Sequence, residues 1–569
     1  MGKLLAPRMN LWCHQIMVAD VLEITEKNKS PLVEALLAKL EERDRLIDDL
    51  HEQVNALTEQ NKVLKDEIAA LKKSSKRPKF TKKSNPRPKP KSGSGAKRPG
   101  SEKKQKKANL KIDETRVITP SGLPEGSKLK RTRSVVVQNL VVKSHNVKFV
   151  LEQWETPSGK IISGQLPSGL SQGFFGVGLC QYILHQYHHC QVTQPLLREQ
   201  LMEFGIDISI GQINNILTES KDIFHDEKNE ILRKGLEISE WIQTDDTGAR
   251  HKGKTGYCTH IGNELFAWFG SSVSKSRINF LEILNSAFAG KYRLDELTFR
   301  YLKEEKLAKH PTNKLKRSIK KEFESKESWN EWLKDLGIVK PRHVKIATEA
   351  ALFSGAVNGG MREDLIILSD DAGQFNIPLM IHALCWVHEA RHIKNLVPIT
   401  DKGRLAQEEV LESIWSFYRS LKAYCSAPCD KQRVLLQQKF DDIFKKTTCF
   451  AQLNLAMKRI YNKKSELLVI LDHPDLPGHN NGSEGDIREF VKRRKISGGT
   501  RSASGRRCRD TFASLKKTCR KLGVSFWIYL QDRLSGEGRI KSLPELMVEK
   551  AVKNRHCPLS SNKLEVVSG

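Results

Sequence analysis

Three acidic residues stand where predicted strands end or a predicted helix begins. Asp245 closes the strand-like run IQTD, Asp370 closes the apolar run LIILSD, and Glu484 lies near the start of a helix predicted over 483–495. Carboxylates at the ends of neighbouring strands, joined by one from a helix packed on the sheet, can converge on two divalent ions. Mg²⁺ and Mn²⁺ prefer oxygen ligands and activate water or a 3′-hydroxyl in phosphodiester chemistry. A strand-end Asp is also a common turn residue, so this spacing alone leaves both interpretations open.

The helix that carries Glu484 also carries many cations. At about 100° per residue, Arg488 and Lys495 lie within ~40° of Glu484, and Lys492 lies within ~80°. Such a face offers a metal-binding acid followed by cations that can follow a DNA backbone. A solvated basic helix face is the alternative. The predicted DNA-binding residues are Arg488, Lys492, Arg493, Arg494 and Lys495.

An α/β arrangement of elements is predicted around these acids. The runs SEWIQTDDTGAR, TGYCTHIGN and ELFAWFGSS are typical of three successive strands separated by turns. A charged helical stretch follows over about 275–360, and LIILSDDAGQF and IPLMIHALC then predict two more strands. Helical patterns continue over 400–470. The expected order is therefore a β-meander, helices, two strands and further helices.

The region before this core is predicted to be a small β-rich segment and then helices. Alternating runs over 111–165, among them RSVVVQNLVV, indicate short strands around a Pro-Ser-Gly turn. Residues 194–220 indicate two helices joined at Gly205, the second opened by Ser209 as its N-cap. This is a plausible helix-turn-helix whose second helix would enter a major groove. A plain helical hairpin is the alternative.

Residues 31–73 carry a heptad repeat. Val33, Leu40, Ile47, Val54, Asn61 and Ile68 occupy one seven-residue register, and Leu36, Arg43, Leu50, Leu57, Leu64 and Leu71 follow three places later. β-Branched residues at a with Leu at d favour a parallel two-stranded coiled coil, and an Asn at a fixes its register. The sequence therefore predicts a homodimer through this helix. A helix packed on its own chain is the alternative.

Charge indicates a polyanionic partner. The 569-residue chain has 96 Lys and Arg against 67 Asp and Glu, a net charge of +29. Residues 72–107 hold sixteen of these cations and one acid, so they supply 16 − 1 = 15 of the 29. Because this stretch is also rich in Pro, Gly and Ser, we expect a disordered basic linker that binds phosphates without reading sequence.

The sequence favours a cytoplasmic protein. It contains no run of 18 apolar residues that could span a membrane, and its start lacks the apolar stretch of a secretion signal. Its eleven cysteines are an odd number and scattered, which is typical of reduced intracellular thiols. Cys385 and His388 could form half of a zinc site, but no second pair stands at suitable spacing.

Three ordered motifs resemble those of the insertion-sequence 66 family of bacterial DDE transposases, whose catalytic core has the RNase H-like fold. The first is the strand leading into DDTG at 245–248, where the family has Asp-Glu-Thr-Gly. The second is the strand ending at Asp370, followed by CWVHEAR at 385–391. The third is NNGSE at 480–484, followed by Arg488 and the Arg-Lys pair at 494–495. The similarity covers most of 120–535.

The resemblance implies a DNA transposase that cuts transposon ends and joins 3′-hydroxyls to target DNA. It implies that Asp245, Asp370 and Glu484 hold two Mg²⁺ ions, with Mn²⁺ able to substitute, and that the partner is double-stranded DNA in the bacterial nucleoid. Asp371 adjoins Asp370, so alignment to the strand end decides between them. The paired Cys-x-x-Cys motifs frequent in the family are missing from 111–165. A zinc-stabilised finger is therefore not supported there.

Two other functions share parts of this pattern. A non-catalytic DNA-binding protein would use the coil, the linker and the helix-turn-helix, and an RNase H-like nuclease would hydrolyse without joining. The expected organisation is an N-terminal segment (1–30), coiled coil (31–73), basic linker (74–110), β-rich region (111–165), helix-turn-helix region (166–235), RNase H-like α/β catalytic domain (236–500) with a helical insertion at about 271–360, and a C-terminal helical region (501–569).

Overall fold

The computed structural model describes residues 112–166 and 175–556, together with nine helical residues between 38 and 54. The chain divides into two units, 1–137 and 138–569, and every strand and helix described below belongs to the second. The predicted N-terminal segment 1–30, the basic linker 74–110 and most of the predicted coil lie outside the described residues. The nine helical residues all fall within the predicted coil.

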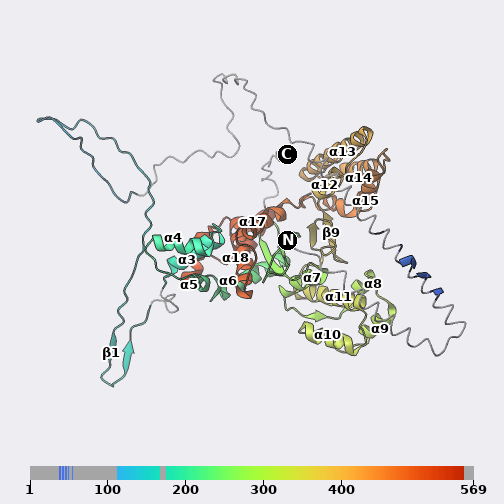
Figure 1. Ribbon diagram of the computed structural model, residues 1–569, viewed down its shortest axis with the longest axis horizontal. Helices are drawn as coiled ribbons and strands as arrows, with labels where there is room; N and C mark the ends of the chain where they lie inside the picture. Colours follow the sequence, from blue (N-terminus) through green and yellow to red (C-terminus); the bar gives the residue numbers. More distant parts are fainter. Residues whose placement is uncertain are drawn as a thin grey trace. The chain divides into compact units, whose positions relative to one another are not determined.

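A five-stranded mixed sheet forms the centre of the fold, in the order β5-β4-β3-β8-β9. Its strand β9 is labelled in Figure 1. The first three strands along the chain form an antiparallel meander, and β8 and β9 run parallel to β3. All five strands agree with the strands predicted from the sequence. They are β3 (Trp241–Gly248), β4 (Tyr257–Gly262), β5 (Ala267–Ser272), β8 (Ile366–Ser369) and β9 (Ile381–Leu384).

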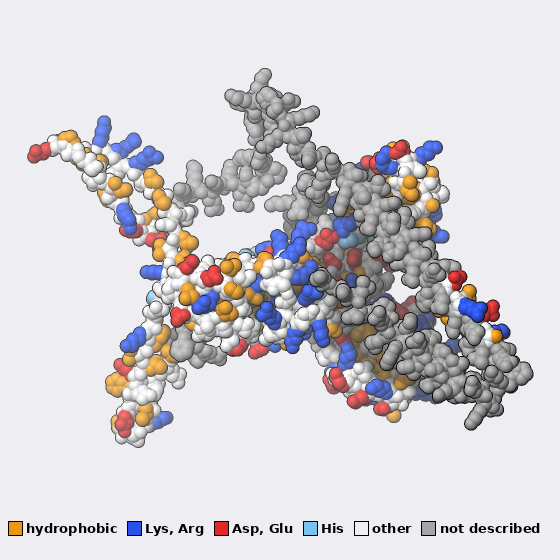
Figure 2. Space-filling model, viewed as in Figure 1, with side chains coloured by type: hydrophobic (Ala, Val, Ile, Leu, Met, Phe, Trp, Pro, Cys, Tyr) orange, Lys and Arg blue, Asp and Glu red, His pale blue; other side chains and the backbone are white. Residues whose placement is uncertain are grey.

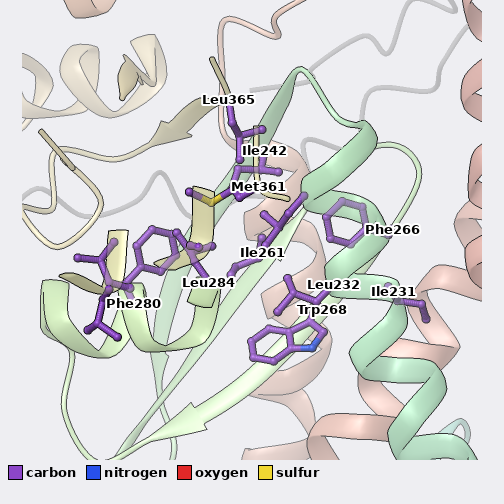
Figure 3. Packing of buried hydrophobic residues seen from close by; sticks show 14 of the residues in the cluster. Ile231, Leu232, Ile242, Ile261, Phe266, Trp268, Phe280, Leu284, Met361 and Leu365 are labelled. Carbon is purple, nitrogen blue, oxygen red and sulfur yellow. The ribbon is translucent and has the colours of Figure 1, made fainter. Parts of the chain in front are cut away.

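One face of the sheet is covered by helices α6 (Asp222–Ile238), α7 (Arg277–Ser286) and α11 (Pro341–Gly359). Ile242, Ile261 and Trp268 from three adjacent strands point into this layer (Figure 3). Leu232 of α6 and Leu284 of α7 meet them there. Burying each such side chain contributes about 1.5–3 kcal/mol, so this layer holds the sheet in place.

The insertion between β5 and β8 is mainly helical, as expected for about 271–360. Buried aromatic residues stabilise it, with the ring of Trp329 stacked on Tyr292 at a centroid distance of 5.5 Å. Besides α7 and α11 it contains β6 (Tyr292–Arg293), α8 (Glu296–Glu304), α9 (Lys309–Lys316), β7 (Glu322–Phe323) and α10 (Lys326–Asp335).

The opposite face of the sheet carries α17 (Asn481–Ser497), and α18 (Ala503–Leu522) covers the edge strand β5. The backbone N–H groups of residues 267, 269 and 271 donate to side chains of α18 at 3.2, 2.9 and 2.8 Å. The acceptors are Thr518, Ser514 and Asp510, one helical turn apart. Two residues of a strand span about 6.6 Å and four residues of a helix span about 6 Å. Every second N–H group of β5 therefore lies opposite every fourth residue of α18. The helix thus shields an edge that could otherwise pair with another chain.

The predicted end of the catalytic domain at residue 500 therefore needs correction, because α18 is an integral part of the sheet's packing. Its apolar residues share one core with α6 and with the C-terminal helices. A charged helix sequence such as ASGRRCRDTFASLKKTCRKL gives little sign of this burial. The C-terminal helices are α19 (Phe526–Ser535) and α20 (Leu543–His556).

A separate helical cluster follows β9 and has its own core, with Trp386 packed against Phe417 and Phe440. Its helices are α12 (Trp386–Lys394), α13 (Asp401–Ser426), α14 (Asp430–Phe444), α15 (Ala451–Tyr461), α16 (Lys464–Leu467) and the 3-10 turn η2 (Val469–Leu471). No helix in the described ranges is long and apolar enough to cross a membrane.

The two helices predicted around Gly205 are present. Helix α4 (Gln194–Glu203) ends before Gly205, which has φ +75°, and α5 (Ile210–Thr218) begins after Ser209. The Ser209 side chain and Gln212 form a capping box. Helix α3 (Val177–His188) precedes them. Whether α5 contacts DNA stays a prediction.

The β-rich region predicted over 111–165 contains one short antiparallel hairpin within the described ranges, formed by β1 (Gln153–Glu155) and β2 (Ile161–Ser163). The run at 133–142, predicted as a strand, forms none. Most of its apolar residues are exposed, among them Val137 and Leu140, both 81% exposed, while Val136 is half-buried. An alternating pattern specifies a strand only where a partner strand and a core accept it, and this run has neither among the described residues.

Candidate active site at the carboxyl ends of two parallel strands

Asp245 and Asp370 lie on neighbouring strands. Asp245 is in β3, and Asp370 follows directly after β8. The two strands pair in parallel with Gln243 beside Leu368. Two residues further along each strand, the side-chain alternation brings Asp245 and Asp370 to the same face of the sheet. Both carboxylates are half-buried. Asp370 follows the end of its strand, as predicted, but the prediction that Asp245 ends its strand is wrong, because β3 stays paired with β4 as far as Gly248.

The first turn of α17 is hydrogen-bonded to the same face. The backbone N–H of Ser483 donates to Oε1 of Gln243 at 3.1 Å, and the Ser483 hydroxyl shares a hydrogen bond with Nδ1 of His260 at 2.7 Å. A Cβ at Gly482 would overlap the side-chain oxygen of Gln243, so this approach requires glycine. These contacts fix the helix end that carries Glu484.

Asn480, the N-cap residue of α17, is fully buried and joins three segments. Its Nδ2 donates to the carbonyl of Thr244 at 2.9 Å, and its backbone N–H donates to Sγ of Cys385 at 3.2 Å. Burial raises the pKa of the Cys385 thiol. Because this thiol accepts a hydrogen bond inside the core, it helps to hold the start of α17 beside β9.

The three acids share one electrostatic environment. Burial raises the pKa of Asp245 to about 7; the Asp246 N–H lowers it, and the charges of Asp370, Asp246 and Glu484 raise it further. The structure thus brings the three predicted residues near enough to repel one another. A carboxyl group with a raised pKa beside other carboxylates is typical of sites that bind a cation or transfer a proton.

Glu484 contacts two residues that we did not predict as part of the site. Its Oε1 lies 3.4 Å from Nε2 of His388 and 3.9 Å from Nη2 of Arg391, both on α12. The same oxygen is buried and accepts no hydrogen bond from the described residues. The two residues stand three apart in CWVHEAR, so helical spacing already placed them on one face of a helix. Only the fold could show that this face meets Glu484.

The neighbouring acids Asp246 and Asp371 have other partners. Asp246 accepts hydrogen bonds from Thr259 at 2.5 Å and from Gln374 at 2.9 Å. Asp371 forms ion pairs with Lys463 and with Arg459, the latter at 3.5 Å. Asp371 is therefore neutralised by cations of the helical cluster, which favours Asp370 as the member of the acid trio. Asp370 also accepts a hydrogen bond at its own turn, from the N–H of Ala372.

The donor set fits a hard divalent cation, since all three side chains offer carboxylate oxygens and one of them, Oε1 of Glu484, accepts no hydrogen bond from the described residues. Within the described ranges, however, no three His, Cys, Asp or Glu side chains stand close enough together to enclose an ion. The carboxylates thus approach one another without forming a closed site.

The five predicted DNA-binding cations separate into two groups. Arg488, Lys492 and Lys495 are exposed, and Lys and Arg side chains gather over the α17–α18 part of the face seen in Figure 2. Arg493 is buried, and Arg494 donates to the carbonyl of Gly248. Arg493 was predicted to bind DNA, and its burial leaves that role a prediction. At about 100° per residue this residue lies roughly 180° from Glu484, so helical geometry turns it into the core.

The fold and site define an α/β protein with an acidic edge on a mixed sheet, and comparison with known proteins gives its family. Residues 359–507, which include Asp370 and Glu484, match the model described as "Transposase IS66 family". The chain is also 38% identical over 324 residues to "Uncharacterized protein y4jO" of Sinorhizobium fredii (strain NBRC 101917 / NGR234), covering 56% of this chain and 100% of that protein. The chain belongs to the IS66 transposase family.

Proposed function

We propose that this protein is an active DNA transposase that cleaves at transposon ends and transfers the resulting 3′ ends into target DNA. The observation that carries the proposal is geometric: the parallel pairing of β3 with β8 places Asp245 and Asp370 side by side, and the first turn of α17, which carries Glu484, is hydrogen-bonded to the same strand β3. The strand order, with an antiparallel meander followed by two parallel strands, is compatible with an RNase H-like core. Membership of a transposase family supports DNA as the substrate.

Asp245, Asp370 and Glu484 would hold Mg²⁺, for which Mn²⁺ can substitute. When bound, such ions supply an activated oxygen nucleophile and stabilise the leaving oxygen. The chain's own residues prepare this arrangement. Gln243 and Ser483 fix the helix that carries Glu484, while His388 and Arg391 limit the orientations of its carboxylate.

Exposed cations of α17 would hold the DNA backbone near these acids. Arg488 and Lys492 follow Glu484 by one and two helical turns, so they can contact backbone phosphates as the DNA runs away from the acids along α17. Helix α5 would read the end sequence in the major groove, and the linker at 74–110 would add affinity without specificity.

A dimer through residues 31–73 would pair two transposon ends. Ile47 and Val54, which the heptad repeat assigns to a positions, are 46% and 55% exposed in the single chain. Light scattering of the whole protein and of a 31–73 deletion tests this arrangement. We expect the whole protein to be a dimer and the deletion variant to be a monomer. The same oligomeric state for both proteins would refute a dimer through this segment.

The reaction itself is tested by incubating the protein with its flanking element DNA and Mg²⁺, then mapping every new end and junction by sequencing. A transposase gives cleaved ends and joined products. Cleaved ends without junctions would indicate a nuclease, and bound but unchanged DNA would indicate a non-catalytic DNA-binding protein.

A further inference from the structure

A small cavity lies on the side of α17 that faces away from Glu484. It is enclosed by α17, α18, the end of α3 and Phe269 of β5, and its volume is about 30 Å³. One water molecule needs about 10–15 Å³ by this measure, so the cavity takes a group of a few atoms and excludes a nucleoside. Two arginines, Arg493 and Arg509, contribute to its wall.

Arg493 is buried in this wall, and its two terminal nitrogens have no hydrogen-bond partner in the described part of the chain. Arg493 is 8% exposed, and its guanidinium carbon lies over the ring of Tyr187, 3.8 Å from the ring centroid. Stacking covers the flat face of the guanidinium and leaves the N–H groups at its edge available. Neither Nη1 nor Nη2 has an acceptor among the described residues.

Arg509 repeats this arrangement from α18. It is also 8% exposed, its guanidinium lies 4.7 Å from the ring centroid of Phe490, and its Nε and Nη2 have no acceptor within the described ranges. Burial lowers the pKa of Arg509, and the like charge of Arg493 lowers it further. Two cations that repel each other therefore share one wall with four unpaired nitrogen donors.

The acids in the same wall are already paired with lysines. Asp486 lies 2.9 Å from Nζ of Lys521 and 3.3 Å from that of Lys517, and Glu489 lies 3.0 Å from Lys517. Within the described part of the chain neither acid forms an ion pair with Arg493 or Arg509. Neither guanidinium thus forms a direct ion pair within the described ranges, although the charge of Asp510 attracts Arg509 from a longer distance, and burying cations without a direct partner is costly.

We infer that Arg493 and Arg509 together bind one phosphate group, which supplies both the missing negative charge and up to four acceptor oxygens. The group is either free inorganic phosphate or a single phosphate of a DNA backbone. The site is distinct from the acid trio, and its binding does not depend on the proposed catalysis. By joining α17 to α18, a bound phosphate would hold the helix that carries Glu484 against the helix that covers β5.

Inorganic phosphate is the probe for the first test. Equilibrium dialysis of the full-length protein with radioactive phosphate, in chloride buffer of constant ionic strength, should show saturable binding, and phosphate should raise its melting temperature. Arg493→Gln and Arg509→Gln should each weaken binding by about tenfold or more, because each removes charge-assisted hydrogen bonds. Arg419→Gln is the matched control, since Arg419 is an exposed arginine on α13, and it should bind as the wild type does.

Two results would overturn the inference. One is wild-type protein that neither binds phosphate beyond the level of a folded Arg493→Gln variant nor gains thermal stability from it. If Arg493→Gln does not fold, Arg509→Gln and the wild-type melting curve decide in its place. The other is an equal loss of phosphate binding in the Arg419→Gln control, which would show that the binding depends on the overall positive charge of the protein and not on this site.

Duplex DNA distinguishes the two sources of phosphate. If a backbone phosphate occupies the site, DNA displaces the radioactive phosphate, and Arg493→Gln lowers the salt dependence of DNA binding by about one phosphate contact. If free phosphate is the ligand, DNA leaves it bound and the salt dependence is unchanged. Both results support a phosphate site.

Discussion

Nε2 of His388 lies 3.4 Å from Oε1 of Glu484, and so links the second sequence motif to the third. His388 stands on α12 and Glu484 on α17, and the chain between them forms the helical cluster with its separate core. We therefore predict that the imidazole positions the carboxylate of Glu484, the one predicted acid that a helix carries. Partners of this kind fix the orientation of metal-binding carboxylates.

Replacing His388 with Ala should lower cleavage and joining by about ten- to a hundredfold and raise the Mg²⁺ concentration needed for half-maximal activity. A loss of fold would not shift the metal dependence in this way. His310→Ala, at an exposed position of α9, is the control and should change neither quantity. If the His388→Ala variant is folded and less active but needs the same Mg²⁺ concentration as the wild type, His388 does not position Glu484 for metal binding.

Asp370 and Asp371 should differ sharply despite being adjacent. Asp370→Asn removes a carboxylate of the trio, and we expect activity to fall by orders of magnitude with DNA binding retained. Asp371→Asn breaks partly exposed ion pairs to Lys463 and Arg459, which contribute only about 0–1 kcal/mol. Cleavage assays and melting curves of both variants, measured side by side, check this assignment. A larger loss of activity in Asp371→Asn would make Asp371 the member of the trio instead of Asp370.

The raised pKa of Asp245 predicts a pH-dependent stability in metal-free protein. Between the pKa of an unfolded Asp, near 3.8, and about 7, the folded state holds the proton and the unfolded state does not. The free energy of unfolding should therefore fall as pH rises through this window. Asp245→Asn should remove this part of the slope and stabilise the metal-free protein at pH 8 by about 1–2 kcal/mol.

Urea unfolding in EDTA at pH 5 and pH 8 measures this effect, with Asp246→Asn as a comparison because Asp246 is hydrogen-bonded to Thr259 and Gln374. We expect Asp246→Asn to be less stabilising, since it disturbs those bonds. An Asp245→Asn variant that is less stable than the wild type at pH 8 would contradict the electrostatic account of the site.

The exposed cations of α17 predict a change in the salt dependence of DNA binding. Arg488→Ala combined with Lys492→Ala should reduce the slope of log affinity against log salt by about 1–2, because each residue neutralises one phosphate. Arg419→Ala on α13 should leave it unchanged. The measurement is fluorescence anisotropy with duplex DNA at several salt concentrations, and an unchanged slope in the double variant would place the DNA elsewhere.

Much of the central sheet could be predicted from the sequence because its strands are short apolar runs bounded by turn residues. LIILSD placed Asp370 at a strand end, and NNGSE placed Glu484 in the first turn of a helix. IQTD placed Asp245 in a strand, but that strand continues to Gly248. Each of these signals depends only on neighbouring residues, so it can be recognised without knowing the fold.

The contacts between distant segments could not be predicted in this way. The burial of α18 rests on three side chains that match the edge of β5, and a basic helix sequence gives no sign of such a partner. The largely exposed run at 133–142 has the alternation of a strand, but no strand among the described residues pairs with it. Arg493 is a different case, because helical geometry already placed it opposite Glu484.

The most direct test of the account compares wild-type protein with Asp245→Asn on flanking element DNA in Mg²⁺, with cleaved ends and strand-transfer junctions mapped by sequencing. The account predicts junctions with the wild type only when Mg²⁺ or Mn²⁺ is present. It predicts a loss of orders of magnitude with Asp245→Asn, while DNA binding persists. Junction formation by Asp245→Asn at the wild-type rate, or by wild-type protein in EDTA, would contradict it.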